Sequence, residues 1–369
     1  MEYSEQEQIL IWLSSIEGIG PKRYYGLISL YPDPFELWEE LNPNNPALNI
    51  LGDKVKRLVL ENKSKDSINR LFEKLESKKV QAVSISSYAY PQLLREIVDA
   101  PPVLFVKGDV SLLSQRCISI VGSRRCTRYG REAAAYFARS LAAEGVVVVS
   151  GMARGVDSEA HKGALEVDGG RTMAVLGCGV DMVYPPEHFK LYEEIIARGA
   201  VVSDYPLGTP PLAQHFPARN RIISGLSEST ILVEADERSG ALITVDYAVE
   251  QGREVYCVPG SIFAQTSRSP NRLIKMGANL AADVADVLGN GYNSKDTLFS
   301  NARKPVQLDI NEQKIIDILQ EGETGAEELI IRLGLDASET QSILALMELR
   351  GIIKKLPGGA YCIEGSEYC

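Results

Sequence analysis

Short runs of β-branched and other apolar residues alternate with stretches of helical spacing through the middle of the chain. Near-continuous apolar strands separated by helices are typical of parallel sheets covered on both faces, so this pattern predicts a doubly wound, Rossmann-like α/β domain. The predicted strands are Cys117–Val121, Val146–Ser150, Met173–Leu176, Val201–Ser203, Thr230–Val233 and Glu254–Val258. The predicted helices are Arg131–Glu144, Ser158–Glu166, Phe189–Ala197, Arg219–Leu226 and Ala241–Gln251. Residues 84–107 are expected to pack against this sheet as a lead-in.

The residues before this domain have helical spacing, beginning with Glu5–Ser15. The turn at Gly18-Ile19-Gly20-Pro21 resembles the hairpin of helix-hairpin-helix or SAM-like modules, whose amides can contact a phosphate. It is also typical of a plain turn in a small helical bundle, and we favour that interpretation because a GxG pattern is common.

The C-terminal residues have a third pattern. Three helical stretches, Asn311–Gln320, Gly325–Leu333 and Ser338–Arg350, precede two short strands joined by a Pro-Gly-Gly turn within Gly351–Ile363. Three helices and a hairpin predict a winged helix. We therefore divide the chain into a helical domain (1–79), the Rossmann-like domain (80–290), a polar linker (291–305) and a winged helix (306–369).

Composition narrows the class of protein. No apolar run approaches the roughly 20 residues that a membrane helix needs, and Met1–Leu10 is too acidic and polar for a secretory signal, so we expect a cytoplasmic protein without a membrane partner. The six cysteines form no CxxC pair and the three histidines are scattered, which predicts neither a metal site nor another bound cofactor.

The net charge of −10 argues at first against a nucleic-acid partner, but its distribution matters more than its sum. Residues 306–369 carry 5 basic and 12 acidic residues, so the acidity is concentrated at the C-terminus. Residues 80–290 carry 20 basic side chains, of which 16 are arginine. Arginine suits phosphate because its planar guanidinium can form two parallel hydrogen bonds.

Ligands bind parallel sheets beyond the carboxyl ends of the strands, so the loop after the first strand is the first candidate site. Gly122 allows close approach of a ligand, Ser123 and Thr127 supply hydroxyls, and Arg124 and Arg125 supply charge. The following helix should add free amides. A generic strand-to-helix turn would explain Gly122 but not the clustered arginines.

The loop after the second strand repeats this chemistry with Ser150, Gly151, Arg154 and Gly155. Asp157 can cap the helix that follows, and His161 lies one turn later. For these last two residues we favour a structural role over catalysis. Cys178, after the third strand, has no nearby base and is expected to be a small buried residue.

Two later loops complete the candidate site. Arg219 and Arg221 flank Asn220 at the expected start of a helix, and Phe216 offers an aromatic face for a base. We favour an anion site here over the alternative, an internal ion-pair network with local acids. The remaining candidates for phosphate contact are Ser239, Gly240, Thr244 and Gly260.

Taken in order, these motifs resemble the DNA-processing protein A (DprA or Smf) family, and the flanking helical and winged domains fit that family too. The motifs are Gly122-Ser123-Arg124, Ser150-Gly151-x-Ala153-Arg154-Gly155-x-Asp157, Phe216-Pro217-x-Arg219-Asn220-Arg221-Ile222-Ile223-x-Gly225-Leu226, Ser239-Gly240 and Val258-Pro259-Gly260.

The resemblance implies a non-enzymatic protein of natural transformation. Such proteins bind and protect incoming single-stranded DNA, load a RecA-type recombinase on it, and form homodimers through the Rossmann-like domain. Two departures stand out. Pro186 occupies a position where family members often have a basic residue, for which Lys190 is the candidate substitute, and Ser269 replaces a usual glycine.

Two other classes of function compete with this interpretation. Phosphoribohydrolases with a similar sheet need a Gly-Gly-x-Gly-Thr loop and a catalytic glutamate, whereas Arg238–Thr244 lacks both the glycine density and a following glutamate. A dinucleotide oxidoreductase would need GxGxxG in the first loop, which is absent. A scaffold that binds only proteins would leave the arginine-rich loops unexplained.

Overall fold

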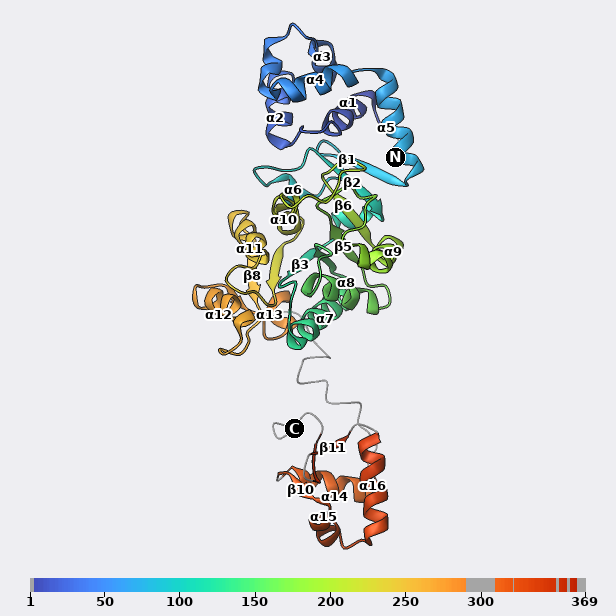
Figure 1. The fold of residues 1–369 in the computed structure, drawn as a ribbon, viewed down its shortest axis with the longest axis vertical. Helices are drawn as coiled ribbons and strands as arrows, with labels where there is room; N and C mark the ends of the chain where they lie inside the picture. Colours follow the sequence, from blue (N-terminus) through green and yellow to red (C-terminus); the bar gives the residue numbers. More distant parts are fainter. Residues whose placement is uncertain (1–2, 290–308, 321, 350–351, 357–358, 364–369) are drawn as a thin grey trace. The chain divides into compact units, whose positions relative to one another are not determined.

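A computed structural model describes residues 3–289, 309–320, 322–349, 352–356 and 359–363. The chain divides into two compact units, Met1–Asn293 and Ser294–Cys369 (Figure 1). The first unit therefore holds both the helical N-terminal residues and the Rossmann-like domain, while the predicted linker, 291–305, lies outside the described residues. Within the described ranges no helix combines the length and the apolar character needed to cross a membrane.

The N-terminal residues form five helices and a 3-10 turn around a core that includes Leu13, Leu27 and Val59. The elements are α1 (Glu5–Ser14), α2 (Pro21–Leu30), α3 (Pro34–Glu40), η1 (Pro46–Leu51), α4 (Asp53–Asn62) and α5 (Lys65–Ser77). The turn between α1 and α2 needs Gly18 because its φ is +90°, which side chains rarely tolerate. Pro21 is the first residue of α2, where its missing N–H has no intrahelical partner to lose.

A nine-stranded sheet forms the centre of the first unit, with strand order β1-β2-β6-β5-β4-β3-β7-β8-β9. The seven strands from β6 to β9 are parallel; the sequence predicted six of them and missed β9. Strand β2, from the predicted lead-in, and β1, which precedes it, add antiparallel pairs at one edge, so the sheet is mixed. The strands are β1 (Val80–Ser84), β2 (Val103–Gly108), β3 (Cys117–Val121), β4 (Val147–Ser150), β5 (Thr172–Val175), β6 (Ala200–Ser203), β7 (Ser229–Leu232), β8 (Glu254–Cys257) and β9 (Asn279–Leu280).

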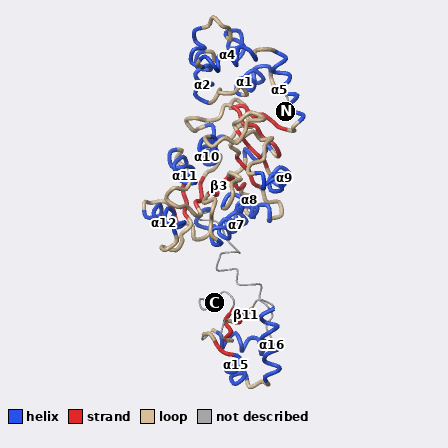
Figure 2. Tube along the Cα trace, in the orientation of Figure 1, coloured by secondary structure: helices blue, strands red, loops and turns tan. Residues whose placement is uncertain are grey.

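Helices cover both faces of this sheet, as the tube in Figure 2 shows. Successive side chains along a strand point to opposite faces, so Val147 and Val149 join one core cluster while Val148 joins the other. The helices of the domain are α6 (Gln92–Arg95), α7 (Arg128–Ala143), α8 (Val156–Glu166), α9 (Phe189–Arg198), α10 (His215–Gly225), α11 (Ala241–Glu250), α12 (Arg268–Lys275) and α13 (Val284–Leu288). Helices α7 and α8 pack on one face, and α10 and α11 pack on the other.

The second unit is a winged helix. Its helices are α14 (Ile310–Leu319), α15 (Ala326–Leu333) and α16 (Ala337–Leu349), and its sheet has the order β10-β12-β11. The strands are β10 (Thr324–Gly325), β11 (Ile353–Lys355) and β12 (Ala360–Ile363). Ile315, Leu329 and Leu344 are buried at the centre of the unit. The predicted fold, a Rossmann-like sheet with a C-terminal winged helix, is confirmed.

Candidate functional site

A cleft of about 620 Å³ opens at the carboxyl ends of β3 and β7. Ten residues predicted from the sequence line it: Gly122, Ser123, Arg124, Arg125, Phe216, Arg219, Asn220, Ser239, Gly240 and Thr244. A side pocket of about 30 Å³ brings Gly151 and Arg154 beside Arg124 and Phe216. The topology thus gathers loops that lie more than a hundred residues apart in the sequence at one edge of the sheet.

Arg124 and Phe216 form the most distinctive pair in the cleft. The Arg124 guanidinium lies 5.7 Å from the centre of the Phe216 ring. The centre of the Tyr184 ring lies 5.2 Å from the centre of the same Phe216 ring. Arg124 is exposed, so its charge can reach a ligand. A cation beside two aromatic rings suits a ligand that alternates phosphates with flat bases.

Further arginines surround this pair. Arg125 and Arg238 are exposed, and within the described part of the chain neither they nor Arg124 form an ion pair. Arg154 is exposed as well but pairs with Glu187, its Nε donating to Oε1 at 2.5 Å. The Arg154 guanidinium holds the pKa of Glu187 below its ordinary value. Three arginines are therefore directly available to an anionic ligand.

A buried carboxylate occupies the start of α7, where the sequence predicted free amides. The Thr127 amide and hydroxyl each donate to the Glu234 carboxylate at 2.7 Å. A Cβ on Gly130 would lie 2.3 Å from a Glu234 carboxylate oxygen. The prediction that Thr127 contacts a phosphate is therefore corrected, because Glu234 already accepts from both its amide and its hydroxyl.

Arg219 is part of the cleft floor and is only 4% exposed. Its guanidinium donates to the backbone oxygens of Gly151, at 2.9 Å, and Val175. A side chain on Gly151 would come within 2.6 Å of this guanidinium, which explains the glycine. Burial lowers the pKa of Arg219 to about 10, so it stays charged at neutral pH. Arg219 thus holds together the loops after β4 and β5.

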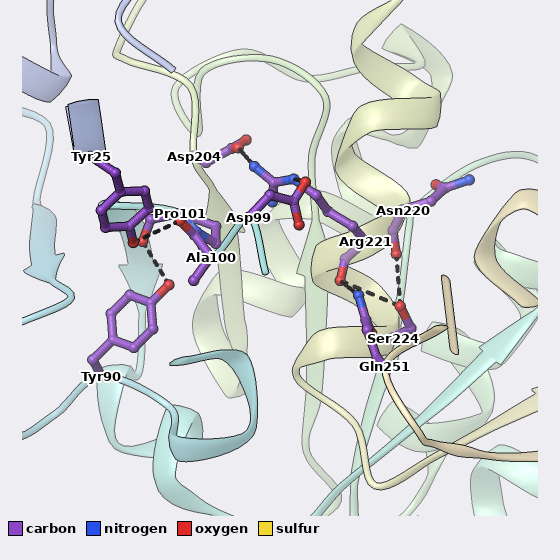
Figure 3. Close-up of polar contacts among 10 residues, drawn as sticks. All are labelled: Tyr25, Tyr90, Asp99, Ala100, Pro101, Asp204, Asn220, Arg221, Ser224 and Gln251. Atoms are coloured by element: carbon purple, nitrogen blue, oxygen red, sulfur yellow. Dashed lines mark hydrogen bonds and ion pairs between the residues drawn. The ribbon is translucent and has the colours of Figure 1, made fainter. Parts of the chain in front are cut away.

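Arg221 is 5% exposed and is absent from the cleft lining. Figure 3 shows its side chain directed toward Asp204 and Asp99. Its Nη2 lies 2.7 Å from Asp204 and its Nε 3.0 Å from Asp99. The side chain of Gln251 donates to its backbone oxygen at 3.0 Å. The predicted anion site at Arg221 is therefore wrong, and the alternative, an internal ion-pair network, describes this residue. Because α10 begins at His215, the free amides expected beside Arg219 and Arg221 do not occur there.

Comparisons with known proteins give the decisive observation. A family model described as DNA recombination-mediator protein A matches residues 81–291, and a DprA winged helix domain model matches residues 300–359. The chain belongs to the DprA/Smf family.

Three DprA/Smf proteins illustrate the similarity. Protein Smf of Escherichia coli strain K12 is 38% identical over 294 residues, which cover 77% of this chain and 78% of that one. The X-ray structure of DprA from Streptococcus pneumoniae is 34% identical with a TM-score of 0.65, and the match covers 78% of this chain and 98% of that one. A Helicobacter pylori structure that concerns a single-stranded DNA binding mode is 30% identical with a TM-score of 0.51, covering 56% and 94%.

The DprA/Smf motifs divide into residues that face the cleft and residues that build it. Among the builders, the Ser150 hydroxyl donates to the Ile120 carbonyl at 2.6 Å. Gly155 has φ +78°, and a Cβ there would lie 2.3 Å from the Ser123 carbonyl oxygen. Gly260 packs against Ser267. Lys190 is exposed on α9, outside the residues that line the cleft.

The sequence interpretation missed several cleft residues of this DprA/Smf chain. Arg238, Asp236, Tyr184 and Ala213 line the cleft but were not predicted as ligand contacts. Arg238 and Asp236 follow β7 directly, so the rule that ligands meet the carboxyl ends of strands could have found them. No group of three or more metal-binding side chains gathers anywhere in the described ranges.

His161 is fully buried on α8, and its Nδ1 lies 2.6 Å from the Thr172 hydroxyl. Asp157 is also buried, accepting a hydrogen bond from the Gly151 amide at 3.2 Å, and burial raises its pKa. Asp157 does not cap α8, whose N-cap is Gly155. The predicted helix cap at Asp157 is therefore wrong, although both residues are buried within the fold.

The buried His161 should make stability depend on pH. Burial lowers its pKa from 6.5 to about 3, so the unfolded chain binds a proton more tightly than the folded chain. The free energy of unfolding should therefore fall as the pH drops below 6.5, by up to about 1.4 kcal/mol per pH unit. Urea unfolding of the wild type and His161→Gln at several pH values checks this. An identical slope in the variant would contradict it.

Proposed function

We propose that this chain binds single-stranded DNA in the cleft and carries it without chemically changing it. The observation that supports this most is the exposed Arg124 beside the Phe216 ring, flanked by Arg125 and Arg238. Arginines can neutralise successive phosphates while the ring stacks on an unpaired base. The Helicobacter pylori structure concerns single-stranded DNA binding, which agrees with this chemistry.

Single strands should bind more tightly than duplex because the bases of a duplex are stacked on one another and cannot reach Phe216. We expect the arginines of the cleft to contact phosphates, which carry no sequence information, so we expect little sequence preference. Ser239 and Gly240, at the N-terminus of α11, line the same cleft, where the Ser239 hydroxyl can donate to a phosphate.

Fluorescence anisotropy with labelled strands tests this function. The affinity for a single strand should exceed that for duplex, and each neutralised phosphate should add about 0.7 to the logarithmic salt slope. Mononucleotides and dinucleotide cofactors should bind weakly or not at all. A salt-independent affinity or a preference for duplex would contradict the proposal, and a preference for a mononucleotide would favour the alternative, a nucleotide-processing enzyme.

We also propose that the chain acts in the cytoplasm, protects the strand and loads a RecA-type recombinase onto it. The support is membership of the DprA/Smf family and a cleft lined by exposed arginines. Recombinase ATPase activity on strands already covered by a single-strand-binding protein should rise when this chain is added. Unchanged activity, together with normal DNA binding, would restrict the proposal to strand binding.

A homodimer through the Rossmann-like domain is the proposed assembly. Strand β9 is an open edge of the sheet; Leu280 within it and Met276, three residues before it, expose apolar side chains. Open edges and apolar surfaces are usually covered by a partner. Leu280→Lys should shift the sedimentation coefficient toward the monomer, while Leu346→Lys on α16 serves as an exposed-leucine control. Equal sedimentation of wild type and Leu280→Lys would place the interface elsewhere.

The winged helix should contribute little to single-strand affinity. A groove-reading module needs a basic face, yet residues 306–369 have more than twice as many acidic as basic residues. Helix α16, which would enter a groove, carries Glu339 and Glu348. Truncation after Asn301 should therefore leave single-strand affinity within about threefold of the full chain, measured by anisotropy. Loss of binding in a truncated chain with a normal circular dichroism spectrum would refute this.

A further inference from the structure

The loop after β8 carries two apolar side chains that project into solvent. We call residues 260–267 the finger. Within it Ile262 is 79% exposed and Phe263 is 90% exposed. Burying two large apolar side chains would stabilise the protein, yet here both are in water. Such exposed apolar pairs are typical of contact surfaces.

The base of the finger is firmly attached, so the exposure of its tip is not the result of a loose loop. Asn271 bonds to both backbone groups of Gly260, accepting from its amide at 3.2 Å and donating to its carbonyl at 2.9 Å. The Tyr129 hydroxyl donates to the Pro259 carbonyl at 2.6 Å, and the Ala235 amide donates to the Thr266 carbonyl at 2.8 Å. These bonds fix both ends of the finger.

The finger and the cleft share one anchor. The Thr266 hydroxyl donates to the Glu234 side chain at 3.0 Å, and the Ser123 amide donates to the Glu234 backbone oxygen at 2.6 Å. Ser123 lines the cleft, as does Asp236, two residues after Glu234. The finger therefore stands beside the cleft at the same edge of the sheet.

The charges around the finger favour an anionic occupant. Arg125 and Arg238 lie on the cleft side, and Arg268 begins α12 directly after the finger; all three are exposed. Asp236 and Glu237 are also exposed nearby, but one Asp236 oxygen accepts the Arg238 amide at 2.8 Å. An exposed aromatic ring on a loop that arginine-bearing segments of the cleft and of α12 adjoin has the composition of a single-strand contact.

We propose that Phe263 is a second stacking platform for the strand held in the cleft. The bound strand then runs from Arg124 and Phe216, past Arg125 and Arg238, to the finger. This inference rests on the proposed function, because it extends the path of the same ligand beyond the cleft.

Affinity for strands of two lengths tests the path. Single-strand-binding domains cover about 4 to 16 nucleotides, so oligothymidines of about 5 and about 20 nucleotides separate the cleft from the longer path. In the full-length protein, Phe263→Ala should weaken binding of the long strand about tenfold, which corresponds to ~1.4 kcal/mol, and leave the short strand unchanged. Phe35→Ala, at an exposed phenylalanine on α3, is the matched control and should bind both strands as the wild type does.

A second variant reports stacking directly. The fluorescence of Phe263→Trp should be quenched by the long strand and not by the short one, above the signal of the two native tryptophans. Unaltered long-strand affinity in Phe263→Ala, while the wild type binds both lengths, would overturn the inference alone. Failure of the wild type to bind either strand would overturn the proposed function and the inference with it. A change in sedimentation of Phe263→Ala would make the finger a subunit contact and also overturn the inference.

Discussion

Replacing Arg124 by alanine is expected to weaken single-strand binding by about ten- to a hundredfold. Arg124 follows β3 and lies over Phe216 in the cleft, where its guanidinium can grip one phosphate with two parallel hydrogen bonds. A charge-assisted hydrogen bond contributes roughly 1.5–3 kcal/mol, and ~1.4 kcal/mol is tenfold in affinity. Arg124→Lys keeps the charge but loses the forked contact, so it should recover only part of the affinity. Anisotropy titration at fixed salt is the measurement.

The chain contains a matched control for this substitution. Arg128 is an equally exposed arginine one helical turn later, but it pairs with Glu132 and does not line the cleft. Arg128→Ala should bind nearly as the wild type does. Arg124→Ala should also unfold at nearly the same temperature, because an exposed cation–π contact contributes only about 0.5–1 kcal/mol. Wild-type affinity in Arg124→Ala would place the site elsewhere, and unfolding of the variant would make Arg124 structural.

Arg221→Ala is expected to lower the free energy of unfolding by about 3–5 kcal/mol and to leave the affinity for single strands nearly unchanged. This is the opposite of the result expected for Arg124→Ala. The substitution leaves the carboxylate of Asp204, which is largely buried, without its partner at 2.7 Å. It also releases Asp99, whose neighbour Ala100 accepts a hydrogen bond from the Tyr25 hydroxyl at 3.0 Å. The network therefore joins α10 to the β1–β2 connection and, through Tyr25, to the N-terminal helices. Urea unfolding measures the loss.

A double variant separates the stability effect from any direct contact with DNA. Asp204→Asn combined with Arg221→Ala removes the unpaired charge and should regain part of the lost stability. At a temperature where Arg221→Ala is still folded, its affinity for a single strand should stay within about threefold of the wild type. A variant of wild-type stability that no longer binds DNA would instead restore Arg221 as a ligand contact.

The sheet could be predicted well because its strands are buried on both faces and read as apolar runs. Strand β3 begins and ends where the pattern placed it, at Cys117–Val121. The antiparallel strands β1 and β2 were not predicted as strands. Their composition is equally typical of a segment that packs against a sheet without joining it. Helix α10 begins at His215, four residues before its predicted start, and holds Pro217 in its first turn. Proline is tolerated in the first turn, where no intrahelical hydrogen bond is lost.

That error at α10 also explains the misassigned arginines. With the helix starting at His215, Phe216, Asn220 and Ile223 lie on one face, and these residues line the cleft. Arg219 and Arg221 are two positions apart, so their side chains point in roughly opposite directions. The sequence shows that Arg219 and Arg221 are cationic, but it does not show whether either side chain is exposed to solvent. The burial of Arg219 under the cleft and the pairing of Arg221 behind it depend on tertiary partners such as Val175 and Asp204.

The carboxylate of Glu234 at the start of α7 has a consequence for the kind of molecule this sheet can accept. In Rossmann domains that hold NAD or FAD, the pyrophosphate sits at the N-terminus of the helix after the first strand of the unit. Here Glu234 already receives the Thr127 amide and hydroxyl in that place. A dinucleotide would have to displace a buried negative charge with its own. The Glu234 carboxylate thus occupies the place that a cofactor's pyrophosphate takes in other Rossmann domains. A phosphate-bearing ligand of this sheet is therefore expected to contact the arginines on the other side of the cleft.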